Sequence, residues 1–257
     1  MFIDNHCHVF SEYYNDIDSV IKNCKLHNIN KIIISGTDIS SNMEVLELVN
    51  KYDIVYGTIG FHPTELDDFK DSYFDWLESN IDNNKIIGIG EIGLDYHYDN
   101  TDKNKQIEVF KRQLCIAEKH GMPIIVHSRD SMGDTYNILK RYKLNGVIHC
   151  FSGSVEMARE FTKIGYYIGV GGIITYKNAK TIKEVVKDIS LSYILLETDS
   201  PYLSPEPFRG KVNYPSNIPL IAKAIADIKS VSITDVARVT TSNSESVFDF
   251  FRKWCYN

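Results

Sequence analysis

Long apolar runs are missing from this sequence of 257 residues. Runs such as the one within residues 31–35 are far too short for a transmembrane helix, which needs about 20 apolar residues. The first residues show neither the basic segment nor the apolar segment of a secretory signal. We therefore expect no membrane association and no secretion.

Cysteine is scarce and scattered. The chain has five cysteines, an odd number, and their spacing matches neither a zinc finger nor a thioredoxin-like motif. They are Cys7, Cys24, Cys115, Cys150 and Cys255. Disulfides persist mainly in oxidising compartments. We therefore expect reduced thiols in a cytoplasmic protein.

An excess of basic charge is also missing. The 28 Lys and Arg residues face 34 Asp and Glu residues, for a net charge of −6. This disfavours non-specific, histone-like binding of nucleic acid, although a local patch can still steer a polyanion. No Pro/Gly/Ser-rich linker and no low-complexity tract divides the chain, and its 43% hydrophobic content suits a large core. We expect one domain over residues 1–257.

What the sequence does contain is an alternation of short β-branched runs with longer amphipathic stretches. The runs are typical of strands buried on both faces, as in parallel sheets. Strand candidates are residues 2–4, 31–35, 55–59, 86–91, 123–127, 146–149, 166–170 and 193–197, and helix candidates are residues 105–120, 154–163, 178–189, 218–230 and 242–254. Eight strands alternating with helices predict an α/β fold, the TIM-type (β/α)8 barrel. An open doubly wound sheet is the alternative.

Histidines and acidic residues gather where these strand candidates end, which is where barrel enzymes keep their chemistry. They are His6 and His8, His62, Glu91, His127, His149 and Asp199. His6 and His8 share a face because strand side chains alternate. A single histidine at such a position is usually a hydrogen-bonded core residue. Several ionisable groups crowded at one barrel mouth need partners, and a divalent cation meets that need. The pattern predicts a metal site.

Other polar residues near these positions receive supporting roles. Glu197 and Asp4 each lie two residues before a candidate ligand, so we expect them to orient the site. Asp95 is interpreted as structural. Alternation predicts that Cys7 and Cys150 point away from the site into the core. The remaining histidines, His27, His97 and His120, are interpreted as surface or structural residues.

Seven motifs in chain order resemble those of the TatD family of metal-dependent deoxyribonucleases, in the amidohydrolase superfamily. They are DNHCH (4–8), GFHP (60–63), GEIGLDY (90–96), PIIVHSRD (123–130), HCFSGS (149–154), ETDSPY (197–202) and RGKVNYP (209–215). Any one motif is weak evidence, but their order and coverage of nearly the whole chain are specific. The departures, Asn5 and Val212, do not touch a ligand position.

The resemblance implies two divalent ions, Mg, Mn or Zn, with Glu91 as the bridging ligand. His6, His8, Glu91 and Asp199 would hold one ion, and Glu91, His127 and His149 the other. Mixed nitrogen and oxygen ligands favour Zn or Mn over Mg. Asp199 would act as general base. His62 would contact the scissile phosphate, together with Arg129 and Arg209 unless these two form loop salt bridges.

The resemblance further implies a DNA substrate and 3′-to-5′ exonuclease action, with no obligate protein partner evident. Tyr96, Phe151, Tyr202 and Phe208 fall in expected mouth loops, where they either stack on a frayed base or pack as a lid. Two other functions remain open at this point. One is hydrolysis of an ester or amide, such as that of an aminoacyl-tRNA, because the same barrel and metals would serve. The other is a metal-holding scaffold without turnover, against which the full set of polar groups argues.

Overall fold

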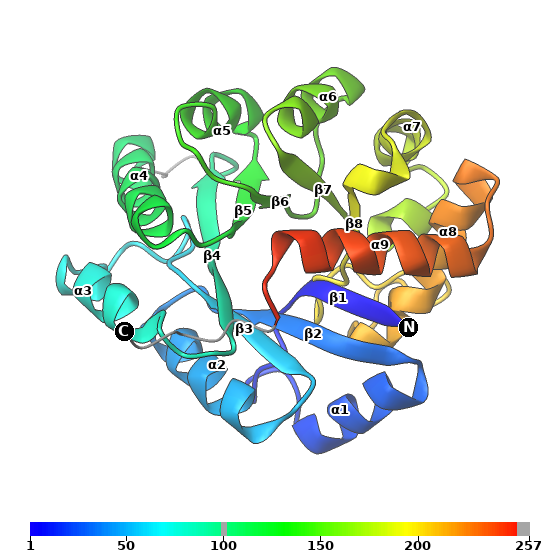
Figure 1. Ribbon diagram of the computed structural model, residues 1–257, viewed down its shortest axis with the longest axis horizontal. Helices are drawn as coiled ribbons and strands as arrows, with labels where there is room; N and C mark the ends of the chain where they lie inside the picture. Colours follow the sequence, from blue (N-terminus) through cyan, green and yellow to red (C-terminus); the bar gives the residue numbers. More distant parts are fainter. Residues whose placement is uncertain (99–101, 251–257) are drawn as a thin grey trace.

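The computed structural model describes residues 1–98 and 102–250. Eight parallel strands pair in chain order, and helices surround them on the outside (Figure 1). The strands are β1 (Phe2–Cys7), β2 (Ile29–Ser35), β3 (Val55–Ile59), β4 (Ile86–Asp95), β5 (Ile124–Arg129), β6 (Gly146–Ile148), β7 (Tyr166–Val170) and β8 (Ile194–Leu196). The helices are α1 (Ile17–Leu26), α2 (Ile39–Lys51), α3 (Ser72–Asn80), α4 (Lys103–His120), α5 (Met132–Leu139), α6 (Val155–Lys163), α7 (Lys180–Asp188), α8 (Ile218–Lys229) and α9 (Ile233–Val247). Three short 3-10 helices, η1 (Gly172–Thr175), η2 (Leu191–Tyr193) and η3 (Pro215–Asn217), lie beside β7 and β8 and before α8.

The sheet closes where β1 meets the chain that follows β8. The backbone N–H of Asp199 donates to the carbonyl of His6 at 3.0 Å, and that of His8 donates to the carbonyl of Ser200 at 2.6 Å. The buried Asp4 carboxylate accepts hydrogen bonds from the backbone N–H of Thr198 at 2.9 Å and from its hydroxyl at 2.6 Å. This nearly closed barrel confirms the expected fold and rules out the open doubly wound sheet.

Local signals explain where the helices begin and end. Asp102 caps α4 by accepting a hydrogen bond from the backbone N–H of Lys105, and Gly121 ends the helix in the left-handed conformation at φ 62°. Asp38 caps α2 in a reciprocal capping box with Ser41. Four helices, α1, α2, α3 and α5, lie outside the helix candidates named from the sequence. In the described residues, no helix is long and apolar enough to cross a membrane.

The expected helix over residues 242–254 is wrong at both ends. Helix α9 begins at Ile233 and ends at Val247, and Phe248 takes an extended conformation. Phe251 and Trp254, which were expected on the same apolar stripe, lie outside the described residues. The apolar pattern continues beyond the end of the helix, because Phe248 and Phe250 pack in a buried apolar cluster that closes the barrel.

This closing cluster gathers residues from the starts and middles of six strands. It consists of Ile3, Ile33, Ile87, Ile125, Val147, Leu195, Val247, Phe248 and Phe250. In Figure 1, α9 crosses in front of the barrel, and the chain after it turns inward. The cluster shares no residue with the polar strand ends described below. One end of the barrel is therefore closed by apolar packing, and the other carries the polar side chains.

We expect the substitution Phe248→Ala to lower the free energy of unfolding by about 3–5 kcal/mol, because it removes a fully buried ring and leaves a cavity. Urea denaturation followed by circular dichroism measures this loss. The control is Leu26→Ala, whose side chain is 68% exposed and which should change stability by less than about 0.5 kcal/mol. Equal effects of the two substitutions would contradict the closing role of Phe248.

Candidate metal centre

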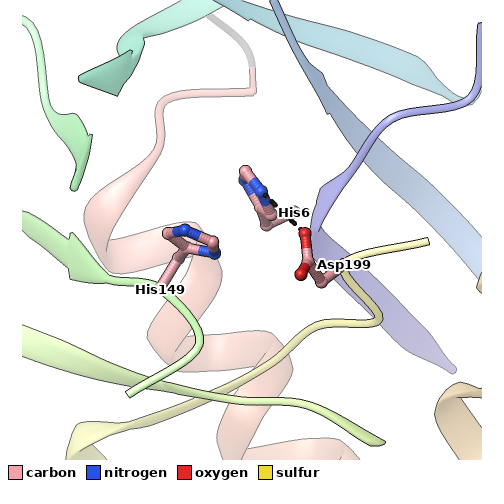
Figure 2. Close-up of side chains that lie close together, drawn as sticks. All are labelled: His6, His149 and Asp199. Carbon is pink, nitrogen blue, oxygen red and sulfur yellow. Dashed lines mark ion pairs between the residues drawn. The ribbon is translucent and has the colours of Figure 1, made fainter. Parts of the chain in front are cut away.

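The six side chains expected to hold metal meet at the C-terminal end of the barrel. His6 and Glu91 lie within β1 and β4, His127 lies within β5, and His8, His149 and Asp199 follow β1, β6 and β8. Figure 2 shows His6, His149 and Asp199 pointing toward one another from three segments of the chain. Three groups of side chains offer ligand atoms within 4.8 Å of one another: His6, His149 and Asp199; His6, His8 and Glu91; and His62, Glu91 and His127.

The Glu91 carboxylate lies at the centre of this cluster. Its Oε2 is 3.3 Å from Nε2 of His6 and 3.4 Å from Nε2 of His8. Its Oε1 is 2.7 Å from Nε2 of His149 and 2.9 Å from Nδ1 of His127. Oε2 therefore faces His6 and His8, and Oε1 faces His127, His149 and, at 3.3 Å, Nε2 of His62.

Within each histidine pair, two ring nitrogens face each other. The Nε2 atoms of His6 and His8 are 3.1 Å apart, and Nδ1 of His127 is 3.1 Å from Nε2 of His149. Oδ1 of Asp199 lies 3.4 Å from Nε2 of His6 and 3.5 Å from Nε2 of His8. Convergent imidazole nitrogens and carboxylate oxygens form a donor set that suits a divalent cation such as Zn²⁺ or Mn²⁺.

Partners on the far side of the rings direct these nitrogens into the site. Nδ1 of His8 lies 2.9 Å from the carbonyl oxygen of Ser35, which can only accept, so Nδ1 carries the proton and Nε2 offers its lone pair. Nε2 of His127 lies 3.0 Å from Oδ2 of Asp95, which fixes Nδ1 as the inward atom by the same argument. The role of Asp95 is thus more specific than the structural one expected, because its side chain orients a candidate ligand.

The two carboxylates and His149 have charges that fit cation binding, whereas the neighbouring carboxylates outweigh burial and raise the pKa of His6, His8 and His127, so a cation would displace protons from these three rings. Burial would raise the pKa of Glu91, but the neighbouring histidines, His149 foremost, hold it well below its usual range. Burial would also raise the pKa of Asp199, but hydrogen bonds from His6 and His8 hold it below its usual value. Burial lowers the pKa of His149 to about 4, so this ring is neutral and its nitrogen is free to ligate. Ionised carboxylates and a neutral imidazole are the forms that ligate metals.

Glu197 lies behind His149, as expected for an orienting residue. Its side chain is fully buried, and Oε1 accepts a hydrogen bond from the backbone N–H of Cys150 and lies 4.0 Å from Nδ1 of His149. Burial raises the pKa of Glu197 to about 8. Neither Nδ1 of His149 nor Oε2 of Glu197 has a hydrogen-bond partner.

The two cysteines beside ligands behave differently from each other. Cys7 is buried, and its thiol donates to the carbonyl of Ile33, as expected for a core residue. Cys150 is half-buried and lines a small cavity with Thr198 and Asp199. Since β6 ends at Ile148 and Cys150 has a φ of 43°, strand alternation does not apply to it, and the direction of its thiol stays a prediction.

His62 is closer to the candidate ligands than a role in substrate binding alone requires. Its Nε2 is 3.3 Å from Oε1 of Glu91, and its ring centroid is 4.3 Å from that of His127. The backbone N–H of Thr64 donates to Nδ1 of His62 at 3.2 Å. A backbone N–H can only donate, so the proton of the neutral ring lies on Nε2, and His62 presents a donor to the site.

Arg129 and Arg209 lie at the same end of the barrel and are exposed. The guanidinium of Arg129 is 5.8 Å from the ring centroid of Tyr98, and that of Arg209 is 4.4 Å from that of Tyr176. Neither arginine forms a salt bridge with a carboxylate in residues 1–98 and 102–250. The alternative role as loop salt-bridge partners is therefore not seen, and their contact with substrate stays a prediction.

Sequence reasoning missed three buried amides that hold the ends of β3 and β4. The side chain of Asn42 hydrogen-bonds to both the N–H and the C=O of Gly60, and that of Gln113 does the same at Phe61. The side chain of Gln106 binds both backbone groups of Asp95. Each amide interrupts the buried face of a helix, and that interruption was the available signal.

Comparison with known proteins gives consistent matches over the whole barrel. The family model for TatD related DNase matches residues 3–249. The metal-dependent hydrolase YabD of Bacillus subtilis is 39% identical over 96% of this chain and 99% of its own length. The TatD homologue YjjV of Escherichia coli has a solved structure that is 30% identical, with a TM-score of 0.92 over 96% of this chain and 98% of its own.

A second solved structure, of a TatD family hydrolase from Entamoeba histolytica, is 28% identical with a TM-score of 0.84, covering 96% of this chain and 97% of its own. An organophosphorus hydrolase from Deinococcus radiodurans matches with a TM-score of 0.63 at 15% identity, covering 96% of this chain and 92% of its own. At that identity the likeness concerns the fold alone.

Proposed function

The chain belongs to the TatD related DNase family of metal-dependent hydrolases, and we propose that its site hydrolyses phosphodiester bonds of DNA. The observation that carries the proposal is the Glu91 carboxylate, whose Oε2 faces His6 and His8 while its Oε1 faces His127 and His149, with His62 beside them. Divalent ions bound at this site would supply the activation of a water and the neutralisation of charge on the phosphodiester oxygens.

In this proposal His6, His8 and Asp199 would hold one ion, His127 and His149 would hold the other, and Glu91 would be a ligand to both. The nitrogen-rich ligand set favours Zn or Mn, and Mg remains a candidate. The division follows the distances, because each pair of histidines approaches a different oxygen of Glu91.

The remaining steps belong to side chains of the chain itself. Oδ1 of Asp199 faces His6 and His8, which leaves Oδ2 to accept the proton of the attacking water as general base. His62, neutral because burial lowers its pKa, donates from Nε2 to a phosphate oxygen. Arg129, at the end of β5, and Arg209, in the loop after β8, would meet the remaining phosphate charge.

The form of the substrate follows from the shape of the site. A barrel mouth walled by loops admits a chain end more readily than a continuous duplex, and reaching an internal phosphate costs a few kcal/mol of unstacking per step. We therefore propose exonuclease action on single-stranded or frayed ends. The 3′-to-5′ direction rests on resemblance to the family.

Two further expectations complete the proposal. A single domain over residues 1–257 and a cytoplasmic location stay predictions. The four described cysteines, Cys7, Cys24, Cys115 and Cys150, are free thiols, as a reducing compartment requires. Cys255 lies outside the described residues.

We predict about two divalent ions per chain, and loss of both in Glu91→Ala, because Glu91 is the only ligand assigned to both ions. Elemental analysis after reconstitution with Zn²⁺ or Mn²⁺ measures the ratio. Glu108→Ala, which removes an exposed glutamate of α4, is the matched control and should keep both ions. A wild-type ratio of one or less contradicts the bridged pair.

We predict that His62→Ala lowers kcat at least tenfold while the metal content stays at the wild-type value, because His62 is assigned to substrate. His127→Ala is the comparison, and it should lose metal together with activity. Elemental analysis and turnover of a chromogenic phosphodiester are measured on the same samples. If both variants lost metal equally, His62 would be a ligand and its assigned role would be wrong.

We predict a ladder of single-nucleotide steps when the metal-loaded enzyme acts on a 5′-labelled linear single strand. A covalently closed circular plasmid should remain intact over the same time course, because it offers no end. Glu91→Ala, purified identically, controls for contaminating nucleases. Rapid nicking of the circle with an untouched linear strand would exclude exonuclease action. If neither DNA is cleaved while an ester or amide is, the bond type is wrong.

A further inference from the structure

The aromatic side chains at the barrel mouth differ in how far they are exposed. Phe151 is buried in the core, and Tyr96 packs against the core and is partly covered, so both serve packing. Tyr202 is 48% exposed and Tyr13 is 38% exposed. Tyr202 lies three residues after Asp199, in the loop that follows β8, and Tyr13 lies in the loop that follows β1. Two exposed rings therefore flank the seam where the barrel closes.

The position of Tyr202 is fixed on several sides. Its backbone N–H donates to the carbonyl of Asp199 at 2.8 Å, and its own carbonyl accepts from the side-chain amide of Asn213 at 2.7 Å. Its hydroxyl donates to the hydroxyl of Tyr13 at 3.1 Å. An exposed ring held at its backbone and at its tip loses little further conformational entropy when it binds a partner.

The ring of Tyr202 also contacts the candidate metal centre. Its centroid lies 6.2 Å from that of His8 at an interplanar angle of 64°, and 5.9 Å from that of Tyr13 at 68°. Among the described residues, Phe10 is the only other Phe, Tyr or Trp whose ring contacts the ring of a candidate ligand, and Phe10 is buried. Both neighbours of Tyr202 approach edgewise, so neither occupies it as a parallel stacked partner.

We propose that Tyr202, held in place by Tyr13, is the surface on which the base of the terminal nucleotide stacks. The inference rests on the proposed function, because it takes the nucleotide phosphate to lie at the metal centre. The base of a nucleotide is separated from its phosphate by one sugar, and the Tyr202 ring lies 6.2 Å from that of His8, beside the centre where the phosphate is taken to lie. Every base has a flat π face, so such a platform selects for the presence of a base and tolerates its identity.

Other exposed aromatic residues fit this role less well. Tyr214 packs against Tyr14, with ring centroids 5.3 Å apart, and Tyr98 lies beside His97 and Arg129. Neither ring makes a described contact with a candidate ligand ring. Tyr202 combines exposure, a fixed position and contact with the centre.

The test compares two 5′-labelled single strands that differ only at the 3′ end, one with an intact terminal nucleotide and one with an abasic terminal residue. For the wild type we expect kcat/KM to be roughly tenfold higher on the intact end, mainly through a lower KM, since stacking of one base is worth about that factor. Tyr202→Leu should bring the ratio close to one. Tyr202→Phe should keep it, because the ring remains and only the hydroxyl is lost.

Tyr193→Leu is the matched control, because Tyr193 is an exposed tyrosine (38%, against 48% for Tyr202) that precedes β8, whereas the site lies beyond the strand's other end. It should leave the wild-type ratio unchanged. Thermal unfolding and metal content of each variant show that it is folded and loaded. An unchanged ratio in Tyr202→Leu overturns the proposal, and so does loss of the ratio in Tyr193→Leu as well.

A measurement on the wild type keeps the proposal testable even where Tyr202→Leu does not fold. A strand that ends in 2-aminopurine behind a phosphorothioate linkage should lose fluorescence on binding, because stacking on the tyrosine quenches it. Bound strand with unquenched 2-aminopurine overturns the platform. If the wild type cleaves neither end yet turns over a small base-free phosphodiester, the DNA substrate itself is wrong. If the wild type cleaves both ends at equal rates, the stacking role of Tyr202 is wrong, whereas the proposed function stands.

Discussion

A carboxylate in a protein interior loses its hydration, and the penalty of several kcal/mol must be offset by nearby positive or donating groups. Glu91 carries this penalty at the centre of the barrel mouth, where its side chain is 4% exposed. Five histidine nitrogens from β1, β3, β5 and β6 or the loops after them lie within 3.4 Å of its two oxygens. No single strand supplies enough of them, so the carboxylate is tolerated only when the barrel is closed.

Closure of the barrel and assembly of the centre are therefore the same event. The seam between β1 and the chain after β8 is formed by backbone hydrogen bonds of His6, His8 and Asp199, and these residues also supply ligand atoms. Asp4 adds side-chain hydrogen bonds to Thr198 at the same seam. The opposite end is closed by an apolar cluster that includes Phe248, so polar and apolar groups are kept at opposite ends of one scaffold.

The candidate ligands could be predicted from the sequence because they follow short apolar runs, and strand ends in a barrel meet at one mouth. The predictions that differ from the structure concern residues whose surroundings depend on where a strand ends. Strand β4 was expected to end at Glu91 but continues to Asp95, which places Asp95 beside β5 and its side chain against His127. Conversely, β6 ends at Ile148, so strand alternation does not determine the direction of Cys150. The amides of Asn42 and Gln113 were missed because their partners are backbone groups, which leave no mark in the sequence.

The way the site would hold DNA follows from how little positive charge the mouth offers. The net charge is −6, and the described cations near the mouth that form no salt bridge include Arg129 at the end of β5 and Arg209 and Lys211 in the loop after β8. Affinity from phosphate neutralisation grows with the number of such cations, but it holds a long polyanion without fixing where its end lies. A chain end bound at the centre needs a further contact that is close, rigid and indifferent to base identity. A tyrosine ring fixed beside His8 meets these requirements, whereas another mobile cation would add attraction without placing the terminal phosphate.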